Sequence, residues 1–253
     1  MQTTTLLGLI LGIGGILLGN FIEGGHVGSL AQGAAAVIVF LGTLGAVVVS
    51  SRKSDLKLAW EIFKKTVSPS SDSKGERTLN EIIECARLAR KETILSIEAK
   101  LGGLSDPFLQ NVLRSVIDNI DAKVIKDVFE KQITIEEEKL MSGAKVWSEA
   151  GGYAPTIGII GAVLGLIHVM GNLSDTSKLG SGIAVAFVAT VYGVGSANLI
   201  LLPIGTRIKK WVNEQIRYKE MILEGGLSIQ AQLPPHLIEL KLKSYLESEE
   251  IKK

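Results

Sequence analysis

The polar residues inside the longest apolar stretches of this sequence are neutral, which limits the ion chemistry that the chain can do alone. They include Thr156, Thr190 and one ionisable side chain, His168. A protein that binds and releases an ion within a membrane by itself normally carries a carboxylate there. Hydroxyl oxygens can also line a path, but the missing acid predicts that, if ions cross here, a second protein supplies the carboxylate. His168 lies near the outer end of its stretch, which favours an interfacial or structural role over a proton relay.

Two prolines, Pro155 and Pro203, lie in the third and fourth apolar stretches. Each lies near the end of its stretch that adjoins a long charged segment. Proline removes a backbone donor and clashes with the preceding helical turn, so each residue is expected to loosen or bend its helix. Prolines also occur at helix boundaries, which is the simpler interpretation. Their matching depth makes a pair of hinges an equally good hypothesis.

A third group of candidates lies on a predicted helix over residues 79–101, opened by the capping-box spacing of residues 78–81. Helical geometry places Arg90 and Glu98 about 80° apart around one cylinder and puts Lys91 and Glu98 on one face. The result is a basic patch with an acidic end that a charged partner could bind. A solvated helix face is the usual alternative for such a run of charges.

Enzyme chemistry is not expected. Three scattered histidines and one cysteine, Cys85, form no nucleophile–base pair, metal-ligand cluster or phosphate-binding loop. The glycines at 12–15 lie inside an apolar stretch, so a nucleotide-binding interpretation fails on context. The net charge of +1 gives no reason to expect nucleic acid as a partner, and no cofactor is expected.

Charge is segregated along the chain, because the mean hydropathy is +0.32 although 21% of the residues are charged. Four runs contain no Asp, Glu, Lys or Arg: residues 1–22, 24–51, 150–174 and 179–206. Each exceeds the roughly 20 residues that a helix needs to cross the hydrocarbon core. In lipid, a single open segment can satisfy its backbone hydrogen bonds only as a helix. We therefore expect transmembrane helices at about 6–22, 33–50, 153–171 and 183–204.

Positive charge orients these spans. Basic residues follow the second and fourth spans at positions 52–53 and 207–210, so both termini and both long polar segments are expected in the cytoplasm. No Lys or Arg precedes Leu6, which disfavours a cleaved signal peptide. The predicted fold is an all-α, polytopic membrane protein with four transmembrane helices in two hairpins. Its expected domains are a first hairpin at 1–51, a helical cytoplasmic loop domain at 52–150, a second hairpin at 151–206 and a cytoplasmic helical tail at 207–253.

Small residues recur at four-residue spacing in every span, for example Gly161 with Gly165 and Ala189 with Gly193. Such ridges let helix backbones approach closely in lipid. Their repetition predicts helices packed against protein on more than one side, and hence an oligomer.

Several segments resemble the MotA-type stator subunits of the MotA/TolQ/ExbB proton channel family. The cytoplasmic loop, the third and fourth spans and the C-terminal segment all carry the resemblance, at residues 86–92 with 96–98, 152–163, 182–190 with 202–203, and 224–230 with 238–242. The resemblance covers nearly the whole chain.

This resemblance implies a bacterial inner-membrane protein that forms a pentameric ring around a MotB-type partner, whose transmembrane aspartate binds the ion. Ion flow then drives rotation and generates torque on the rotor protein FliG. By motif position, Arg90 and Glu98, with Lys91 as a helper, look like the rotor-interacting charges. Pro155 and Pro203 look like the prolines that couple ion flow to torque.

By motif position, Thr190, Thr156 and Ala162 of this sequence look like residues of the family's ion path. Sodium-type members carry threonine at the position of Ala162, and alanine removes an oxygen ligand that a hard cation prefers, so a proton is the expected ion. The alternative functions are an ExbB/TolQ-type subunit that energises an outer-membrane system, disfavoured by the additional N-terminal hairpin, and a structural scaffold that conducts nothing.

Overall fold

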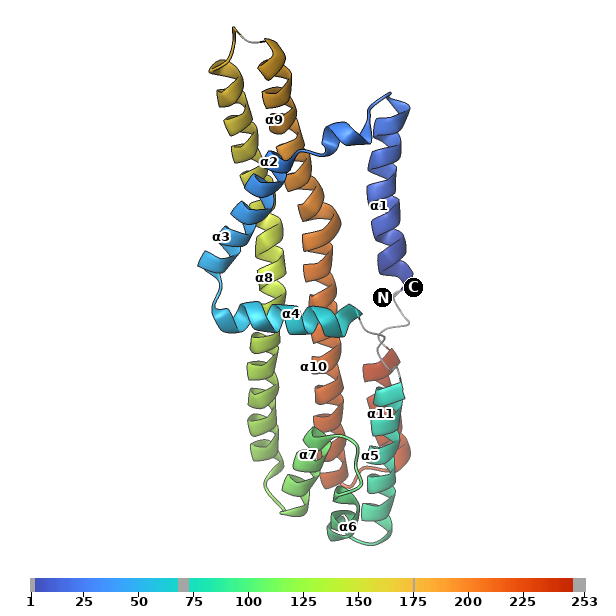
Figure 1. The fold of residues 1–253 in the computed structure, drawn as a ribbon. Helices are drawn as coiled ribbons and strands as arrows, with labels where there is room; N and C mark the ends of the chain where they lie inside the picture. Colours follow the sequence, from blue (N-terminus) through green and yellow to red (C-terminus); the bar gives the residue numbers. More distant parts are fainter. Residues whose placement is uncertain (1–2, 68–72, 175, 248–253) are drawn as a thin grey trace. The chain divides into compact units, whose positions relative to one another are not determined.

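The computed structural model describes residues 3–67, 73–174 and 176–247, and within these ranges every regular element is a helix (Figure 1). The chain divides into two compact units. The described parts of Met1–Pro69 and Leu140–Lys210 form the first, here called the membrane unit. The described parts of Ser70–Lys139 and Trp211–Lys253 form the second unit. The predicted all-α class is confirmed.

Apolar helices dominate the membrane unit. The first is α1 (Thr3–Ile22), and a 3₁₀ turn at Val27–Leu30 leads to the second, which runs from Gly33 to Ser50 as α2 (Gly33–Ala36), a π turn (Val37–Leu41) and α3 (Gly42–Ser50). The third lies in α8 (Ala122–Met170). The fourth runs without a break through α9 (Thr176–Ser196), a second π turn (Ala197–Leu201) and α10 (Leu202–Gln230). These four helices are long and apolar enough to cross a membrane.

Glycines close the contact between α8 and α9. A Cβ on Gly158 would lie 2.9 Å from the Ala189 carbonyl oxygen, and a Cβ on Gly193 would lie 2.5 Å from the Ala154 carbonyl oxygen. Side chains are absent at these points because the two backbones touch, as expected for helices that associate in lipid. By contrast, a Cβ on Gly14 or Gly15 of α1 would meet nothing within 4 Å.

Helix α4 (Lys53–Val67) completes the membrane unit. Two residues separate it from α3, and the extended backbone of the first of them, Ser51, turns the chain. Its inner side is held by Trp147, whose indole Nε1 donates to the Ala59 carbonyl oxygen at 3.2 Å and whose ring lies 5.1 Å from that of Phe63.

The second unit is a small helical bundle. It contains α5 (Ser73–Lys91), a 3₁₀ turn (Ile94–Ile97), α6 (Glu98–Leu101), α7 (Pro107–Ile117), α11 (Pro235–Glu247) and the segments of α8 and α10 that lie outside the membrane unit. Phe108 and Phe129 meet edge to face with ring centroids 5.4 Å apart. Cys85 is fully buried in this unit, and burial raises the pKa of its thiol to about 11, so it behaves as a small core residue.

The predicted helix over 79–101 is wrong at both ends. Helix α5 begins at Ser73, so Thr78 is an interior, fully buried residue and no capping box forms there. The helix ends at Lys91, and Thr93 is extended (φ −150°, ψ 164°). The chain folds back because this buries Ile97, which is 0% exposed, against the bundle. Packing of an apolar side chain overrides the local helical pattern.

A salt bridge verifies the fold-back. The Lys100 ammonium lies 3.1 Å from the Glu84 carboxylate, although 16 residues of continuous helix would separate them by about 24 Å. Helix α6 ends directly before Gly102, and α7 begins at Pro107 behind its cap Asp106. The polar segment 68–75 is predicted to be a loop, but residues 73–75 belong to α5 and residues 68–72 lie outside the described ranges.

Candidate functional site

Three separate groups of residues are candidates for function, and the first is the set of charges at the end of α5. Arg90 and Lys91 end that helix, whereas Glu98 begins α6. The argument that these charges share one helical cylinder is therefore wrong, because the backbone is extended at Thr93 between them. All three are exposed.

Among the residues that the structure describes, none forms a salt bridge with Arg90, Lys91 or Glu98, and the same is true of the adjacent Arg87 and Glu92. Other basic side chains in the same unit are paired, as Lys74 is with Asp106, Arg77 with Glu81 and Lys100 with Glu84, at 3.1, 3.2 and 3.1 Å. An unpaired exposed charge keeps its full field for an incoming partner, whereas an existing pair must first be broken.

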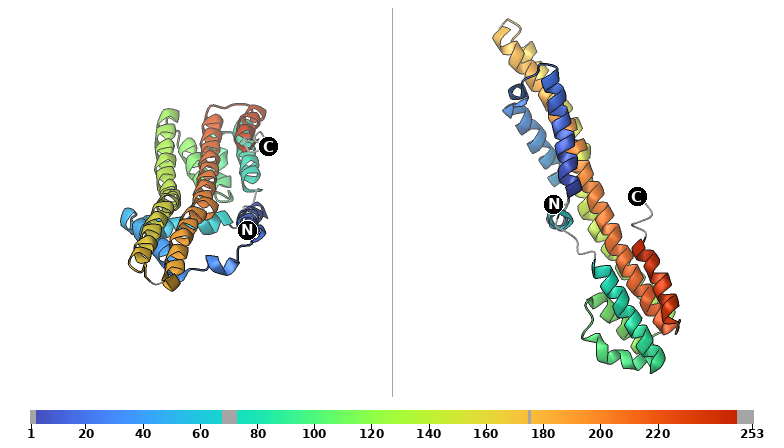
Figure 2. Two further views of the ribbon diagram at one scale, coloured as in Figure 1. Left: turned by 90° about the horizontal axis from the view of Figure 1, so that it is seen from above. Right: turned by 90° about the vertical axis from the view of Figure 1, so that its right-hand side faces the viewer.

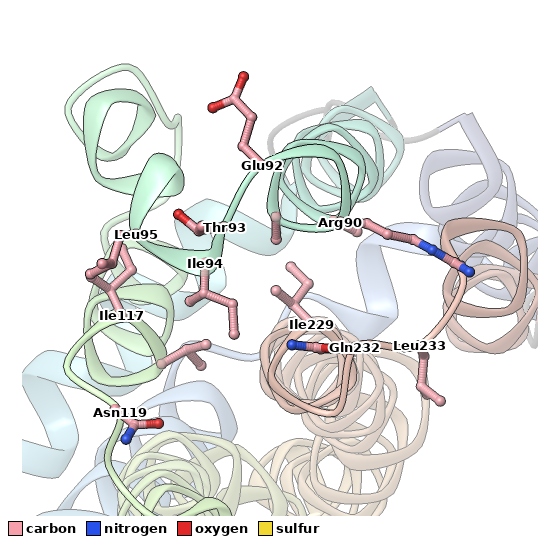
Figure 3. A pocket seen from close by; sticks show the side chains of 13 residues that line it. Arg90, Glu92, Thr93, Ile94, Leu95, Ile117, Asn119, Ile229, Gln232 and Leu233 are labelled. Carbon is pink, nitrogen blue, oxygen red and sulfur yellow. The ribbon is translucent and has the colours of Figure 1, made fainter.

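A hollow of about 590 Å³ opens beside Arg90 (Figure 3). Ile94 and Ile229 point into it, whereas the side chains of Arg90 and Glu92 extend outward past its rim. Its floor includes Asn119, whose φ of 55° marks the left-handed residue that follows a helix. Of the three charges, Arg90 thus stands at the edge of a depression that is lined by both polar and apolar side chains.

The two prolines form the second group. Pro155 lies inside α8, and Pro203 is the second residue of α10, directly after the π turn Ala197–Leu201. Both are therefore interior to continuous helices, and the helix-boundary alternative is excluded. The missing amide of Pro203 leaves the carbonyl four residues earlier without its helical donor, and a widened π turn accommodates the ring there.

The prolines lie where two helices meet closely. A Cβ on Gly151, one turn before Pro155, would lie 2.5 Å from the Leu202 side chain and 3.3 Å from its amide nitrogen. Leu202 directly precedes Pro203. Because the backbones are in near contact, a bend at either proline must displace the other helix.

The third group is the set of ion-path candidates. Thr156 is exposed on α8, and its hydroxyl donates to the Tyr153 carbonyl at 2.8 Å. Thr190 is half-buried on α9, and its hydroxyl donates to the Ala186 carbonyl at 3.3 Å. Each proton is thus directed to its own helix, which leaves oxygen lone pairs for a hydrated ion or a partner.

The facing helices bring these residues to similar depth. A Cβ on Gly158, between Thr156 and the half-buried Ala162, would lie 3.5 Å from the Thr190 Cα. His168 is exposed near the end of α8.

Sequence reasoning missed a polar network that joins helices within the second unit. Asp106 caps α7 through the Phe108 amide at 2.8 Å and also accepts from the Tyr218 hydroxyl at 2.9 Å and the Lys74 ammonium at 3.1 Å. Tyr218 shares a further 2.9 Å hydrogen bond with the buried Thr78.

The network holds Asp106 ionised. Burial raises its pKa, but hydrogen bonds from Tyr218, Lys74 and the Phe108 amide, together with the Lys74 charge, outweigh burial and lower the pKa overall. For Tyr218, burial is the main cause of a raised pKa, and the Asp106 charge adds to it. The Ser-Asp-Pro sequence at residues 105–107 is typical of a helix start, but no sequence spacing relates Asp106 to Lys74 or Tyr218.

In the sequence, Arg207 is only one of the basic residues that orient the fourth span. Its guanidinium donates to the Thr66 carbonyl at 3.3 Å and to the Thr5 hydroxyl, so it joins the start of α10 to the end of α4 and to α1. No sequence spacing signals contacts across 141 and 202 residues.

Known proteins match the whole chain. Residues 100–221 match the model of the MotA/TolQ/ExbB proton channel family. The chain is 32% identical over 246 residues to Motility protein A of Bacillus subtilis (strain 168), covering 97% of this chain and 91% of that protein. The chain belongs to the MotA-type stator subunits.

Solved MotA-type structures agree with this assignment. One of the C. jejuni MotAB complex has a TM-score of 0.88 and 28% identity, covering 97% of this chain and 96% of that one. One of the flagellar MotAB stator complex from Bacillus subtilis has a TM-score of 0.86 and 31% identity, with the same coverage. The predicted stator function is confirmed over the ExbB/TolQ-type alternative. The MotA-type chain is a membrane protein of a channel family.

Proposed function

We propose that this MotA-type chain assembles with a MotB-type partner into an ion channel whose flux drives rotation. One observation carries this proposal: the four membrane spans contain no acidic side chain, although Thr156 and Thr190 supply oxygen atoms on two facing helices. A carboxylate from a partner helix completes such a path, because ion transfer through lipid needs a site that binds and releases the ion. The solved relatives, which are MotAB complexes, support a partner of this kind.

The ring is proposed to be a pentamer of this chain. Apolar side chains on the described spans remain open in the single chain, with Val49 89% and Phe187 70% exposed. Lipid and neighbouring copies account for such faces in a membrane. The proposed location is the bacterial inner membrane with both termini in the cytoplasm, supported by the basic residues that follow the second and fourth spans.

Torque is proposed to pass to the rotor protein FliG through Arg90, Lys91 and Glu98. This role is supported by their exposure and by the lack of a salt bridge to any of them within the described ranges. Pro155 and Pro203 are proposed to couple ion flow to rotation, because the near contact of Gly151 with Leu202 links their two helices.

The transported ion is proposed to be a proton. Ala162 offers no side-chain oxygen, and Na⁺ is a hard cation that takes oxygen ligands. No bound cofactor is needed for this mechanism.

The test is swimming speed in a stator-deleted host that expresses this chain with its cognate MotB-type partner. Sodium is varied at constant pH, and an uncoupler then collapses the proton gradient. Swimming that ignores sodium and stops with the uncoupler is the expected result. Thr190→Ala should slow swimming, and Thr190→Ser, which keeps the hydroxyl, serves as the matched control.

Sodium-dependent swimming would overturn the proton assignment while keeping the stator. A chain that inserts and assembles with its partner but gives no motility in any condition would overturn the proposed torque mechanism.

A further inference from the structure

Helix α4 presents a basic stripe on the side opposite its buried seam. The seam contains Ala59 and Ile62, which are 3% and 1% exposed. The opposite side carries exposed residues at spacings of four, three and four, which place them on one face: Lys53, Lys57, Trp60 and Lys64. These four residues are here called the α4 stripe. Trp60 is 53% exposed, so a large aromatic ring stands among three lysines.

The depth of α4 in the membrane follows from its attachments. Only two residues separate it from Ser50, where α3 and the second candidate span end. It packs on α8 at Trp147, six residues before Tyr153, where the third span is expected to start. Six residues of helix correspond to about 9 Å. The headgroup layer extends about 5–8 Å beyond each side of the hydrocarbon core, so the Trp147 contact places α4 at the outer edge of this layer, where lysine side chains can reach the phosphates.

The orientation of α4 keeps the whole stripe at this level. Figure 1 shows α4 crosswise to the apolar helices of the membrane unit, and the right-hand view of Figure 2 shows it end-on. A helix that crosses the spans in this way runs along the membrane plane, as amphipathic interfacial helices do.

The charge of the segment fits an anionic surface. Residues 52–65 contain five Lys or Arg and two Asp or Glu, which gives a net charge of +3. Glu61 offsets Lys57 only through an exposed contact of 3.9 Å, and Asp55 is engaged by the Ser142 hydroxyl at 3.1 Å. The Lys64 ammonium lies 5.3 Å above the Trp60 ring. Trp is enriched at the headgroup level, and lysines there attract lipid phosphates.

We propose that the α4 stripe binds the headgroups of anionic phospholipids in the leaflet that contacts α4. Lysines supply the charge for the phosphates, and the Trp60 ring packs at the boundary with the acyl chains. This binding requires the membrane insertion of the chain but not its motor activity, so it can be tested without motility.

The experiment uses the purified full-length chain with its MotB-type partner, reconstituted in vesicles of equal parts phosphatidylglycerol and phosphatidylcholine. One lipid at a time carries brominated acyl chains, which quench nearby tryptophan fluorescence. Trp60→Phe gives the background from the other tryptophans and is subtracted. We expect brominated phosphatidylglycerol to quench Trp60 about threefold more than brominated phosphatidylcholine in low salt, and the ratio to approach one in high salt.

Variants separate charge from structure. The triple change Lys53→Gln, Lys57→Gln and Lys64→Gln should bring the quenching ratio to about one, whereas arginine at the same positions should retain it. A control with Lys123, Lys126 and Lys131 changed to Gln removes the same charge from α8, more than twenty residues before Tyr153, and should leave the ratio unchanged.

Equal quenching by the two lipids in the unaltered protein would overturn the proposal, and it is also the result expected if a protein partner covers the stripe. A ratio that persists in the glutamine variant would overturn the role of these lysines.

Discussion

Replacing Asp106 with asparagine tests how strongly one buried charge stabilises the second unit. Asparagine keeps an oxygen for the Phe108 amide, so the helix cap survives. The charge that receives the Tyr218 hydroxyl and the Lys74 ammonium is lost. Hydrogen bonds to charged groups contribute about 1 kcal/mol more than neutral ones. The Lys74 side chain is 59% exposed, so its share is discounted for solvent. The expected loss is about 1.5 kcal/mol.

Hydrogen–deuterium exchange of the full-length complex in detergent measures this loss where it occurs. Amides of α7 that open with the cap should exchange about tenfold faster in Asp106→Asn, because 1.4 kcal/mol corresponds to a factor of ten. Amides of the membrane unit should be unchanged. The effect is specified for neutral pH, where the carboxylate is ionised.

The pH dependence has a defined sign. The folded-state pKa of Asp106 is lowered from its ordinary 3.8, so its stabilising effect is complete above that value. The effect is lost as the pH falls below 3.8 and through the lowered folded pKa. The difference between Asp106 and Asp106→Asn should therefore shrink in that acidic window and stay constant above about pH 5.

Tyr218→Phe is the partner variant, because it removes the hydroxyl that Asp106 and Thr78 both contact. Its effect in the Asp106→Asn background should be smaller than in the unaltered chain, as expected for two groups in one network. Unchanged α7 exchange in Asp106→Asn, or full additivity of the two changes, would refute the reasoning from the network.

Three further outcomes are expected. Arg90→Glu combined with Glu98→Lys should reduce torque, because it reverses exposed charges that lack ionic partners within the described ranges; bead rotation assays measure this. Pro155→Ala should restore the helical amide and impair rotation at an unchanged amount of membrane-inserted protein, measured by the same assay with quantitative immunoblotting. Gly193→Ala should destabilise the α8–α9 pair by about 1–3 kcal/mol through overpacking against the Ala154 carbonyl, measured as a lower melting temperature of the complex.

The glycine prediction has a matched control, and each prediction has a result that would contradict it. Gly195→Ala adds a methyl group two residues further along α9, where a Cβ meets nothing within 4 Å, and should leave the melting temperature nearly unchanged. Equal melting of the two glycine variants would contradict the backbone contact. Normal torque after the double charge reversal would exclude the rotor-contact role, and normal rotation of Pro155→Ala would exclude a hinge at that residue.

The long apolar helices could be predicted from the sequence because their signal is summed over many residues. One apolar helical run of the structure extends over Gly33–Ser50, and the third apolar stretch lies within the single long helix α8. Lipid permits only helices for open chains of this kind, so hydropathy alone decides the structure there.

The second unit was harder to predict because local sequence patterns compete there with long-range packing. The spacing of Thr78 and Glu81 fits a capping box, yet Thr78 is buried inside α5 and bonds to Tyr218, which is 140 residues away. The helical pattern from Arg90 to Glu98 is interrupted because Ile97 packs on the bundle. Individual charges at the candidate site were identified, but their relative placement depended on this turn. The network of Asp106 joins residues that no sequence spacing relates.

The π turn at Ala197–Leu201 also has a consequence for chain length. A regular α-helix turns by about 100° for each residue, so deleting one residue from most of α9 would rotate all later side chains onto different faces. A π turn holds about one residue more than an α turn, and a single deletion inside it can be absorbed as the turn returns to regular helix. A chain that is one residue shorter at this position can therefore keep the side chains of α9 and α10 on the same helix faces. In a sequence alignment, a one-residue gap there would mark a π turn replaced by regular α-helix in an unchanged fold.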